Sequence, residues 1–241
     1  MSQALYQKYR PQNFDEVIGQ DEAIQYFRNV AESAQNTTAP QMEKLAKAKQ
    51  SINSSINHAY LLTGGRGVGK TTLARIFAKS LGTADADIIE LDTASNRGID
   101  EIKELREATL SRPISSTYKV FIMDEVHMIT TQGANALLKT LEEPTPWTIF
   151  ILCTTDPEKL ISTIVSRCQV INLKSPNEAN VFKLLSKINK DENLNLNDDT
   201  LKVISSLNHE SYRDAVGELE RVSWYKGTYI KIDYDNISIN I

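Results

Sequence analysis

The sequence contains few of the residues on which disulfide-rich and metal-centred proteins depend. Two cysteines, Cys153 and Cys168, occur among 241 residues, too few for a disulfide scaffold or a four-cysteine zinc site. The three histidines, His58, His127 and His209, are scattered without the spacing of metal ligands. We therefore expect no disulfide framework and no metal centre built from these residues.

Long apolar runs and an excess of basic residues are also lacking. No run approaches the ~20 apolar residues of a membrane span, and no signal-peptide core follows Met1, so we expect a cytoplasmic protein without membrane contact. The net charge of −4 excludes a generally basic protein that coats nucleic acid, so any DNA contact must use a local patch. An apolar content of 41% supports a large core, with room for a second small domain.

What the sequence has is a glycine-rich loop that fits the phosphate-binding pattern G-x-x-x-x-G-K-[ST]. The loop comprises Gly64, Gly65, Arg66, Gly67, Val68, Gly69, Lys70, Thr71 and Thr72. An apolar run at 59–62 predicts a buried strand before it, and helical spacing from Leu73 predicts a helix that ends at Gly82. In this context Lys70 can reach the β- and γ-phosphates of a nucleotide, and the Thr71 hydroxyl can ligate Mg²⁺.

Apolar runs alternate with helical patterns along the first part of the chain. We expect strands at 59–62, 88–91, 118–123, 148–153 and 169–173, and helices at 21–30, 73–81, 99–110, 133–143 and 160–165. This alternation predicts an α/β core at 1–173 with a five-stranded parallel sheet covered on both faces. Residues 31–57 are polar and are expected to form a surface insertion.

The pattern changes after Lys174. Helix starts near 175–178, 198–200 and 211 predict a small three-helix lid domain within 174–241. The last segment, 227–241, alternates apolar and polar residues and fits either a short strand or a tail.

Carboxylates and hydroxyls follow two of the expected strands. Asp124 and Glu125 end the strand at 118–123, where Asp124 can hold Mg²⁺ and Glu125 can polarise the attacking water. Thr155, with Thr154 as the alternative, follows the next strand and could sense a γ-phosphate. Cys153 is expected to be a buried apolar residue rather than a reactive thiol.

Two arginines could complete a nucleotide site, although spacing alone also fits surface salt bridges. Arg167 follows a helix at the domain edge and could reach a neighbouring subunit's γ-phosphate in trans. Arg213 begins the third lid helix and could reach phosphates within its own subunit.

The order of these motifs resembles the gamma/tau family of bacterial DNA polymerase III subunits, the ATPase motor of the sliding-clamp loader. The resemblance covers residues 4 to about 225 and is carried by the segments 6–11, 14–20, 64–72, 124–128, 135–144 and 166–168. It implies an AAA+ P-loop NTPase core that binds ATP and Mg²⁺. It also implies that Thr155 is the first sensor, Arg167 the trans-acting finger and Arg213 the second sensor. The residues implied to flank the adenine and ribose are Tyr9, Arg10, Pro11, Ile18 and Gly19.

The family also implies partners. ATP binding favours opening of the ring-shaped clamp, and primer–template DNA triggers hydrolysis and release. DNA phosphates meet helix N-termini, which in this sequence would lie near 96–98 and 130–132. Other clamp-loader subunits, the sliding clamp and primer–template DNA are therefore the expected partners.

Three departures from the family pattern change these expectations. The segment 79–85 lacks the four-cysteine module that family members usually carry, so we expect no zinc. Residues 31–57 are longer than the usual connection. The sequence ends where a helical collar domain would begin, so we expect a monomeric or weakly associated chain in which Arg167 lacks a partner site and hydrolysis is slow.

Other functions remain to be compared. A different AAA+ remodeller, such as a branch-migration motor, fits the segments 135–144 and 166–168 less well. A non-hydrolysing structural subunit commonly lacks a working phosphate loop, whereas Lys70, Thr71, Asp124 and Glu125 are all present. A nucleotide-binding interaction module without turnover stays open.

Overall fold

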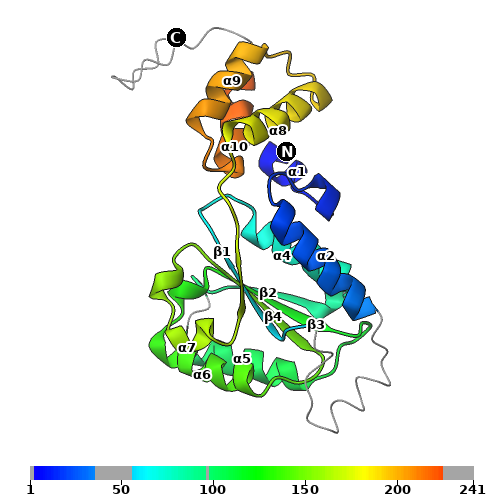
Figure 1. Ribbon diagram of the computed structural model, residues 1–241. Coiled ribbons are helices and arrows are strands. Elements are labelled where there is room, and N and C mark those ends of the chain that lie inside the picture. Colours follow the sequence, from blue (N-terminus) through cyan, green and yellow to red (C-terminus); the bar gives the residue numbers. More distant parts are fainter. Residues whose placement is uncertain (1–2, 36–55, 96–97, 225–241) are drawn as a thin grey trace. The chain divides into compact units, whose positions relative to one another are not determined.

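The computed structural model describes residues 3–35, 56–95 and 98–224 (Figure 1). The chain divides into two compact units, one formed by residues 11–175 and the other by residues 1–10 together with 176–241. Within the described residues, no helix combines the length and the apolar character that crossing a bilayer would need.

The first unit is built on a five-stranded parallel sheet with the strand order β2-β3-β4-β1-β5. The strands are β1 (Ala59–Thr63), β2 (Ile88–Asp92), β3 (Lys119–Asp124), β4 (Thr148–Thr154) and β5 (Gln169–Asn172). All residues of β1 and β4 are buried, which explains why these strands are continuous apolar runs rather than alternating patterns. The predicted five-stranded parallel sheet is confirmed.

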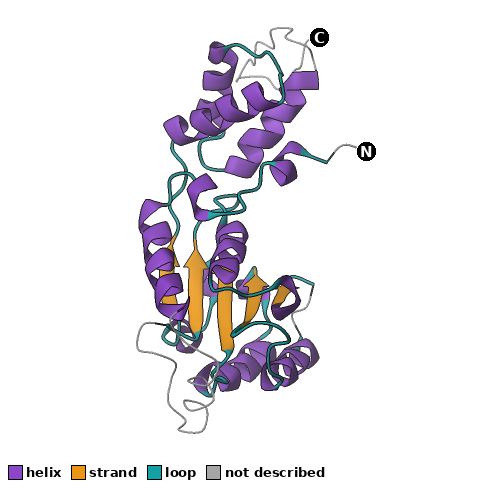
Figure 2. Ribbon diagram, turned by 90° about the vertical axis from the view of Figure 1, so that its right-hand side faces the viewer, coloured by secondary structure: helices purple, strands orange, loops and turns teal. Residues whose placement is uncertain are grey.

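Helices cover both faces of this sheet (Figures 1 and 2). On one face lie α2 (Asp21–Gln35) and α4 (Lys70–Ser80), and on the other lie α5 (Ile99–Leu110), α6 (Thr131–Glu142) and α7 (Ser162–Val165). Successive side chains of a strand point to opposite faces, so Tyr60 packs under α2 and α4, while Leu61 packs with α5 and α6. Each face therefore has its own core.

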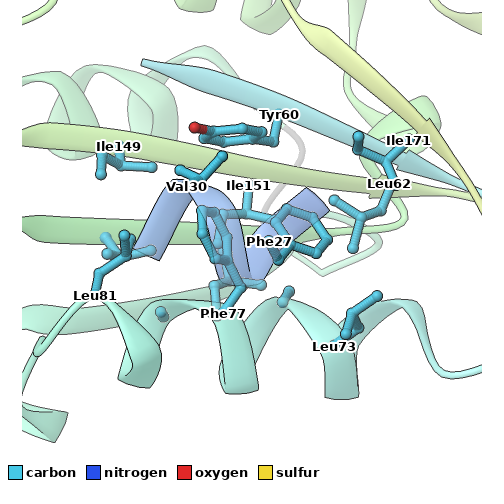
Figure 3. Packing of buried hydrophobic residues seen from close by; sticks show 14 of the residues in the cluster. Phe27, Val30, Tyr60, Leu62, Leu73, Phe77, Leu81, Ile149, Ile151 and Ile171 are labelled. Atoms are coloured by element: carbon cyan, nitrogen blue, oxygen red, sulfur yellow. The ribbon is translucent and has the colours of Figure 1, made fainter. Parts of the chain in front are cut away.

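The core beneath α2 and α4 is rich in aromatic side chains (Figure 3). The ring centroids of Phe27 and Phe77 are 4.2 Å apart, and those of Tyr60 and Phe77 are 5.0 Å apart in an edge-on arrangement. These three side chains are fully buried. They join α2 and α4 to β1, so the strand and the helix on either side of the glycine-rich loop share one packed cluster.

The bounds predicted for the surface insertion, 31–57, are wrong at both ends. The α2 helix continues past the expected end at Val30 to Gln35, and the small side chains of Ala31 and Ala34 are buried against the core. Ile56 is buried as well and belongs to the cluster under α2. The rest of the expected insertion, residues 36–55, lies outside the described residues, as does the tail at 227–241.

The second unit is helical. It contains α1 (Leu5–Lys8), α8 (Glu178–Asp191), α9 (Asp198–Leu207) and α10 (Tyr212–Trp224). The side chains of Asn177 and Asn197 accept hydrogen bonds from backbone N–H groups in the first turns of α8 and α9, which fixes where these helices begin. Their apolar faces enclose one core.

Residues 1–10 belong to this helical unit, so the expected start of the α/β core at residue 1 is wrong. Leu5 is buried in the core of the helical unit, and its backbone N–H donates to Glu220 Oε2 across 3.3 Å. Tyr9 donates its hydroxyl to Glu192 Oε1 at 2.5 Å, and Lys8 Nζ lies 2.6 Å from the same oxygen. These contacts join the two ends of the described chain within one unit.

Candidate nucleotide-binding site

The glycine-rich loop connects β1 to α4, as predicted, and its glycines adopt conformations that other residues avoid. Gly64 has φ +145°, and a Cβ there would lie 2.8 Å from the carbonyl oxygen of Leu173. Gly69 has φ +104° and forms the N-cap of α4. The loop can therefore pass close to β5 and present backbone N–H groups at the helix start, the arrangement that binds phosphate.

Lys70 is the first residue of α4 and is only 6% exposed. Its Nζ donates to the carbonyl oxygens of Gly64 and Gly65, both at 2.8 Å. The ammonium group is thus held over the loop by the loop's own backbone. A phosphate oxygen at this place would find a preplaced positive charge.

Thr71 and Asp124 meet at the end of the sheet. The Thr71 hydroxyl donates to Asp124 Oδ2 across 2.7 Å, which links the first turn of α4 to the last residue of β3. A hydroxyl and a carboxylate are hard oxygen ligands of the kind that Mg²⁺ prefers, so these residues fit the expected metal. Mg²⁺ usually keeps several waters and takes only one or two protein oxygens, which matches this small donor set.

Glu125 occupies a left-handed backbone conformation, with φ 49° and ψ 45°. Such a conformation costs a non-glycine residue about 1–3 kcal/mol and must be held by its surroundings. Thr93, which is fully buried, supplies this support. Its hydroxyl lies 2.6 Å from the carbonyl oxygens of both Asp124 and Glu125, and its backbone N–H donates to the former.

Thr155 is adjacent to Glu125 in space. Its hydroxyl lies 3.3 Å from Glu125 Oε2 and 2.9 Å from Asp156 Oδ2. Thr154 is fully buried, and its hydroxyl is 2.9 Å from His127 Nδ1. Of the two candidate sensors, Thr155 is therefore the one beside the Glu125 carboxylate.

Asp156 remains ionised in this network. The hydrogen bond from the Thr155 hydroxyl, aided by the positive charge of Lys159 and by His127, holds the pKa of Asp156 below its ordinary value. The Lys159 Nζ lies 3.4 Å from Asp156 Oδ2. The Thr155 hydroxyl thus faces two acceptors, one on each carboxylate.

Thr93, His127 and Asp156 belong to the site but were not predicted from the sequence. Asp92 pairs with Asp124 in the register of β2 and β3, which places Thr93 beside the turn at Glu125. Their only signal in the sequence is position, because Thr93 directly follows β2, and His127 and Asp156 lie within a few residues of the ends of β3 and β4.

Arg167 is engaged within its own chain. Its Nη2 lies 2.5 Å from Glu142 Oε1, and its Nη1 donates to the carbonyl of Thr163 at 2.8 Å. Arg213 lies in the first turn of α10, in the helical unit that also contains Tyr9 and Arg10. Pro11, Ile18 and Gly19 belong to the unit with the loop. The nucleotide contacts assigned to these residues stay predictions.

The segments expected to meet DNA are described in part. The helix α6 begins at Thr131, and the Thr130 hydroxyl caps it by accepting from the backbone N–H of Gly133 across 3.1 Å. Residues 96–97 of the other segment lie outside the described residues.

Burial disfavours the thiolate form of both cysteines. Burial raises the pKa of the Cys168 thiol to about 12 and that of the Cys153 thiol well above its ordinary value. Cys153 is fully buried in β4, as expected. In the part of the chain that the structure describes, no group of three or more His, Cys, Asp or Glu side chains could hold a metal ion. The expectation that the chain binds no zinc stays a prediction.

Comparison with known proteins agrees with the resemblance expected from the motifs. A family model described as DNA polymerase III, delta subunit, matches residues 83–177. The chain is 36% identical to DNA polymerase III subunit tau of Bacillus subtilis over 96% of its own length and 41% of that protein's. It is 38% identical to DNA polymerase III subunit gamma of Buchnera aphidicola from Schizaphis graminum, over 90% of its own length and 60% of that protein's.

Among solved structures, the fold is similar to that of the Thermotoga maritima RuvB Holliday junction branch migration motor. The TM-score is 0.66 at 20% identity, over 89% of this chain and 65% of that one. This likeness shows an α/β P-loop NTPase-like fold. The curated relatives are longer than this chain, which spans 41% of the tau subunit and 60% of the gamma subunit named above.

Proposed function

Because this chain resembles DNA polymerase III gamma and tau subunits over nearly its whole length, we propose that it is the ATP-driven motor core of a DNA replication clamp loader. In this role it binds and hydrolyses ATP within the polymerase III holoenzyme, together with other clamp-loader subunits. The cycle places a sliding clamp on primer–template DNA.

The observation that carries this proposal is the contact between Thr71 and Asp124. It brings together the hydroxyl of a phosphate loop and the carboxylate at the end of a neighbouring strand, at 2.7 Å. Mg²⁺ held by these oxygens would neutralise charge on the β- and γ-phosphates. Lys70, which the loop already holds in place, would exchange its two carbonyl partners for phosphate oxygens.

Glu125 and Thr155 supply the remaining groups within the chain. Glu125 would orient the attacking water, since its carboxylate lies at the same strand end as Asp124. The Thr155 hydroxyl would sense the γ-phosphate by leaving its carboxylate partners for a phosphate oxygen. Both groups would respond to the nucleotide without a large movement of the backbone.

Arg167 supports a site that is completed by a neighbouring subunit. The guanidinium is partly exposed, with 34% of the side chain accessible, and its partner Glu142 is 48% accessible. An ion pair this exposed contributes little free energy, so a phosphate of a neighbouring subunit could displace Glu142. Hydrolysis by the chain alone is accordingly expected to be slow.

ATP hydrolysis by the chain, alone and mixed with clamp, primed DNA and the other loader subunits, tests this proposal. We expect clamp and primed DNA to stimulate hydrolysis, and Lys70→Ala to abolish it. Nucleotide binding without stimulated hydrolysis would reduce the chain to a nucleotide-binding module. Absence of nucleotide binding would contradict the assignment of the phosphate loop.

A further inference from the structure

The imidazole of His127 lies between two carboxylates of the candidate site. Its Nδ1 is 3.5 Å from Glu125 Oε2, and its Nε2 is 3.3 Å from Asp156 Oδ2. The His127 side chain is 8% exposed, so it is fixed by the protein rather than by solvent. The ring comes from the short helix at Val126–Met128, directly after the strained turn at Glu125.

The same two carboxylate oxygens share the hydroxyl of Thr155, at 3.3 Å and 2.9 Å. A hydroxyl has one proton and can donate to one acceptor at a time. His127 has two ring nitrogens on opposite sides of the ring: Nε2 faces Asp156, while Nδ1 lies 2.9 Å from the Thr154 hydroxyl and 3.5 Å from Glu125 Oε2. Glu125, Thr155, Asp156 and His127 therefore form a closed ring of contacts, in which Thr155 is the member that can change partner.

We infer that His127 is a positioning residue for Glu125, and that it keeps this carboxylate at the end of β3 when the Thr155 hydroxyl turns to a phosphate oxygen. The inference rests on the proposed function, in which Glu125 orients the attacking water. Without the imidazole, Glu125 Oε2 loses both its contact with His127 and, once Thr155 turns away, its contact with the Thr155 hydroxyl. The carboxylate then samples other rotamers, and fewer encounters with the attacking water are productive.

Three substitutions of His127 test the roles of the two ring nitrogens, one at a time and together. His127→Asn keeps a polar group near the Nδ1 position, His127→Gln keeps one near the Nε2 position, and His127→Phe keeps a ring without nitrogen. For His127→Phe we expect kcat for ATP hydrolysis to fall by about 10- to 100-fold while the dissociation constant for ATP stays unchanged. His127→Asn should recover more of kcat than His127→Gln, because Nδ1 is the ring nitrogen on the side of Glu125 and of the Thr154 hydroxyl.

His58 provides a matched control. It is also a largely buried histidine, with Nδ1 2.9 Å from the carbonyl oxygen of Thr148, but it precedes β1 at the opposite end of the strand from the loop. His58→Gln should leave kcat unchanged. Equal kcat in the wild type and His127→Phe would overturn the inference, and so would a loss of ATP affinity that accounts for the whole effect.

A second measurement needs no turnover and so separates this inference from the proposed function. The chain has three histidines, whose ring nitrogens can be followed in the nucleotide-free protein by ¹⁵N NMR. Glu125→Gln should shift the His127 ring signals and leave those of His58 and His209 in place. An unmoved His127 signal overturns the inference. Absence of Lys70-dependent hydrolysis in the wild type would count against the proposed function, while the spectra would still decide whether His127 and Glu125 interact.

Discussion

The Thr71 hydroxyl and the Asp124 carboxylate are joined by a hydrogen bond of 2.7 Å between the first turn of α4 and the end of β3. The contact means that the loop and the neighbouring strand are already aligned in the protein itself. A divalent cation therefore needs little rearrangement to find both oxygens. The two residues should act as a unit in any measurement that depends on Mg²⁺.

Removing the Thr71 hydroxyl should weaken Mg²⁺-dependent nucleotide binding. We expect Thr71→Val to lower the affinity for Mg²⁺ in the presence of ATP by about 10- to 100-fold, because the side chain keeps its shape but loses its ligand oxygen. Thr71→Ser keeps the hydroxyl and is the matched control. Titration of Mg²⁺ against a fluorescent ATP analogue measures the effect, and equal Mg²⁺ affinity in both variants would contradict the assignment.

Thr93 should stabilise the turn at Glu125. Its hydroxyl is buried between the carbonyl oxygens of Asp124 and Glu125, so Thr93→Val removes a donor and leaves both buried acceptors with poorer partners. We expect the free energy of unfolding to fall by about 1–3 kcal/mol, as measured by urea denaturation.

Thr93→Ser is the control for this prediction, because it retains the hydroxyl while losing one methyl group. It should recover most of the lost stability. If the two variants were equally destabilised, the methyl group rather than the hydrogen bonds would support the strained turn.

Arg167 should matter for hydrolysis only where a neighbouring subunit is present. In the chain alone, Arg167→Ala should leave stability within about 1 kcal/mol of wild type, because the pair with Glu142 is exposed. In an assembled loader the same change should reduce the ATPase rate by about 10³-fold or more, the effect of losing an arginine finger.

Arg221 offers a matched comparison, since it is also exposed and pairs with a glutamate, Glu218, at 2.6 Å. Arg221→Ala should leave the ATPase rate of the assembly unchanged. Equal rates for the assembled Arg167→Ala variant and the wild type would remove Arg167 from the proposed mechanism.

Asp87 should link stability to pH. This side chain is fully buried before β2 and accepts the backbone N–H groups of Ile114 and Ser115, at 2.6 and 2.9 Å. Burial alone would raise the pKa of the carboxyl, but these hydrogen bonds, with those from nearby serine hydroxyls, outweigh it and hold the pKa below its ordinary value.

A pKa lower in the folded than in the unfolded state means that the Asp87 carboxylate stabilises the fold above the unfolded pKa. That contribution is lost as pH falls through the folded pKa. We expect Asp87→Asn to lower the free energy of unfolding at pH 7 by about 1–3 kcal/mol and to flatten its decline between neutral and acidic pH. Urea denaturation at several pH values measures this. Asp85→Asn, at an exposed neighbour, is the control, and an unchanged pH profile in Asp87→Asn would contradict the prediction.

Much of the fold could be predicted because buried parallel strands and amphipathic helices leave local patterns. The helix at Ile99–Leu110 and the strands around the loop follow directly from apolar spacing. The loop itself is recognisable because glycine is needed where φ is positive and where backbone lies close to backbone. These features depend on residues that are near one another in the sequence.

The rest depends on contacts between distant residues. The end of α2 was missed because Ala31 and Ala34 are small side chains in a polar stretch, and only the core shows that they are buried. The roles of Thr93 and His127 require the register of β2 against β3 and the fold of the turn after β4. The grouping of residues 1–10 with the helical unit rests on contacts such as Leu5 with Glu220, which no local pattern contains.

The position of β1 in the sheet has a consequence for synthesis of the chain. Its hydrogen-bonded neighbours are β4 and β5. Ala59 can therefore pair with Phe150, and Tyr60 with Gln169, only after those later residues have been synthesised. As the polypeptide leaves the ribosome, β2 and β3 can pair early, whereas the strand that carries the phosphate loop stays unmatched until most of the first unit has been made. A nascent chain that ends before β4 therefore has no paired strand behind its phosphate loop, and β1 lacks the two strands that flank it in the complete unit.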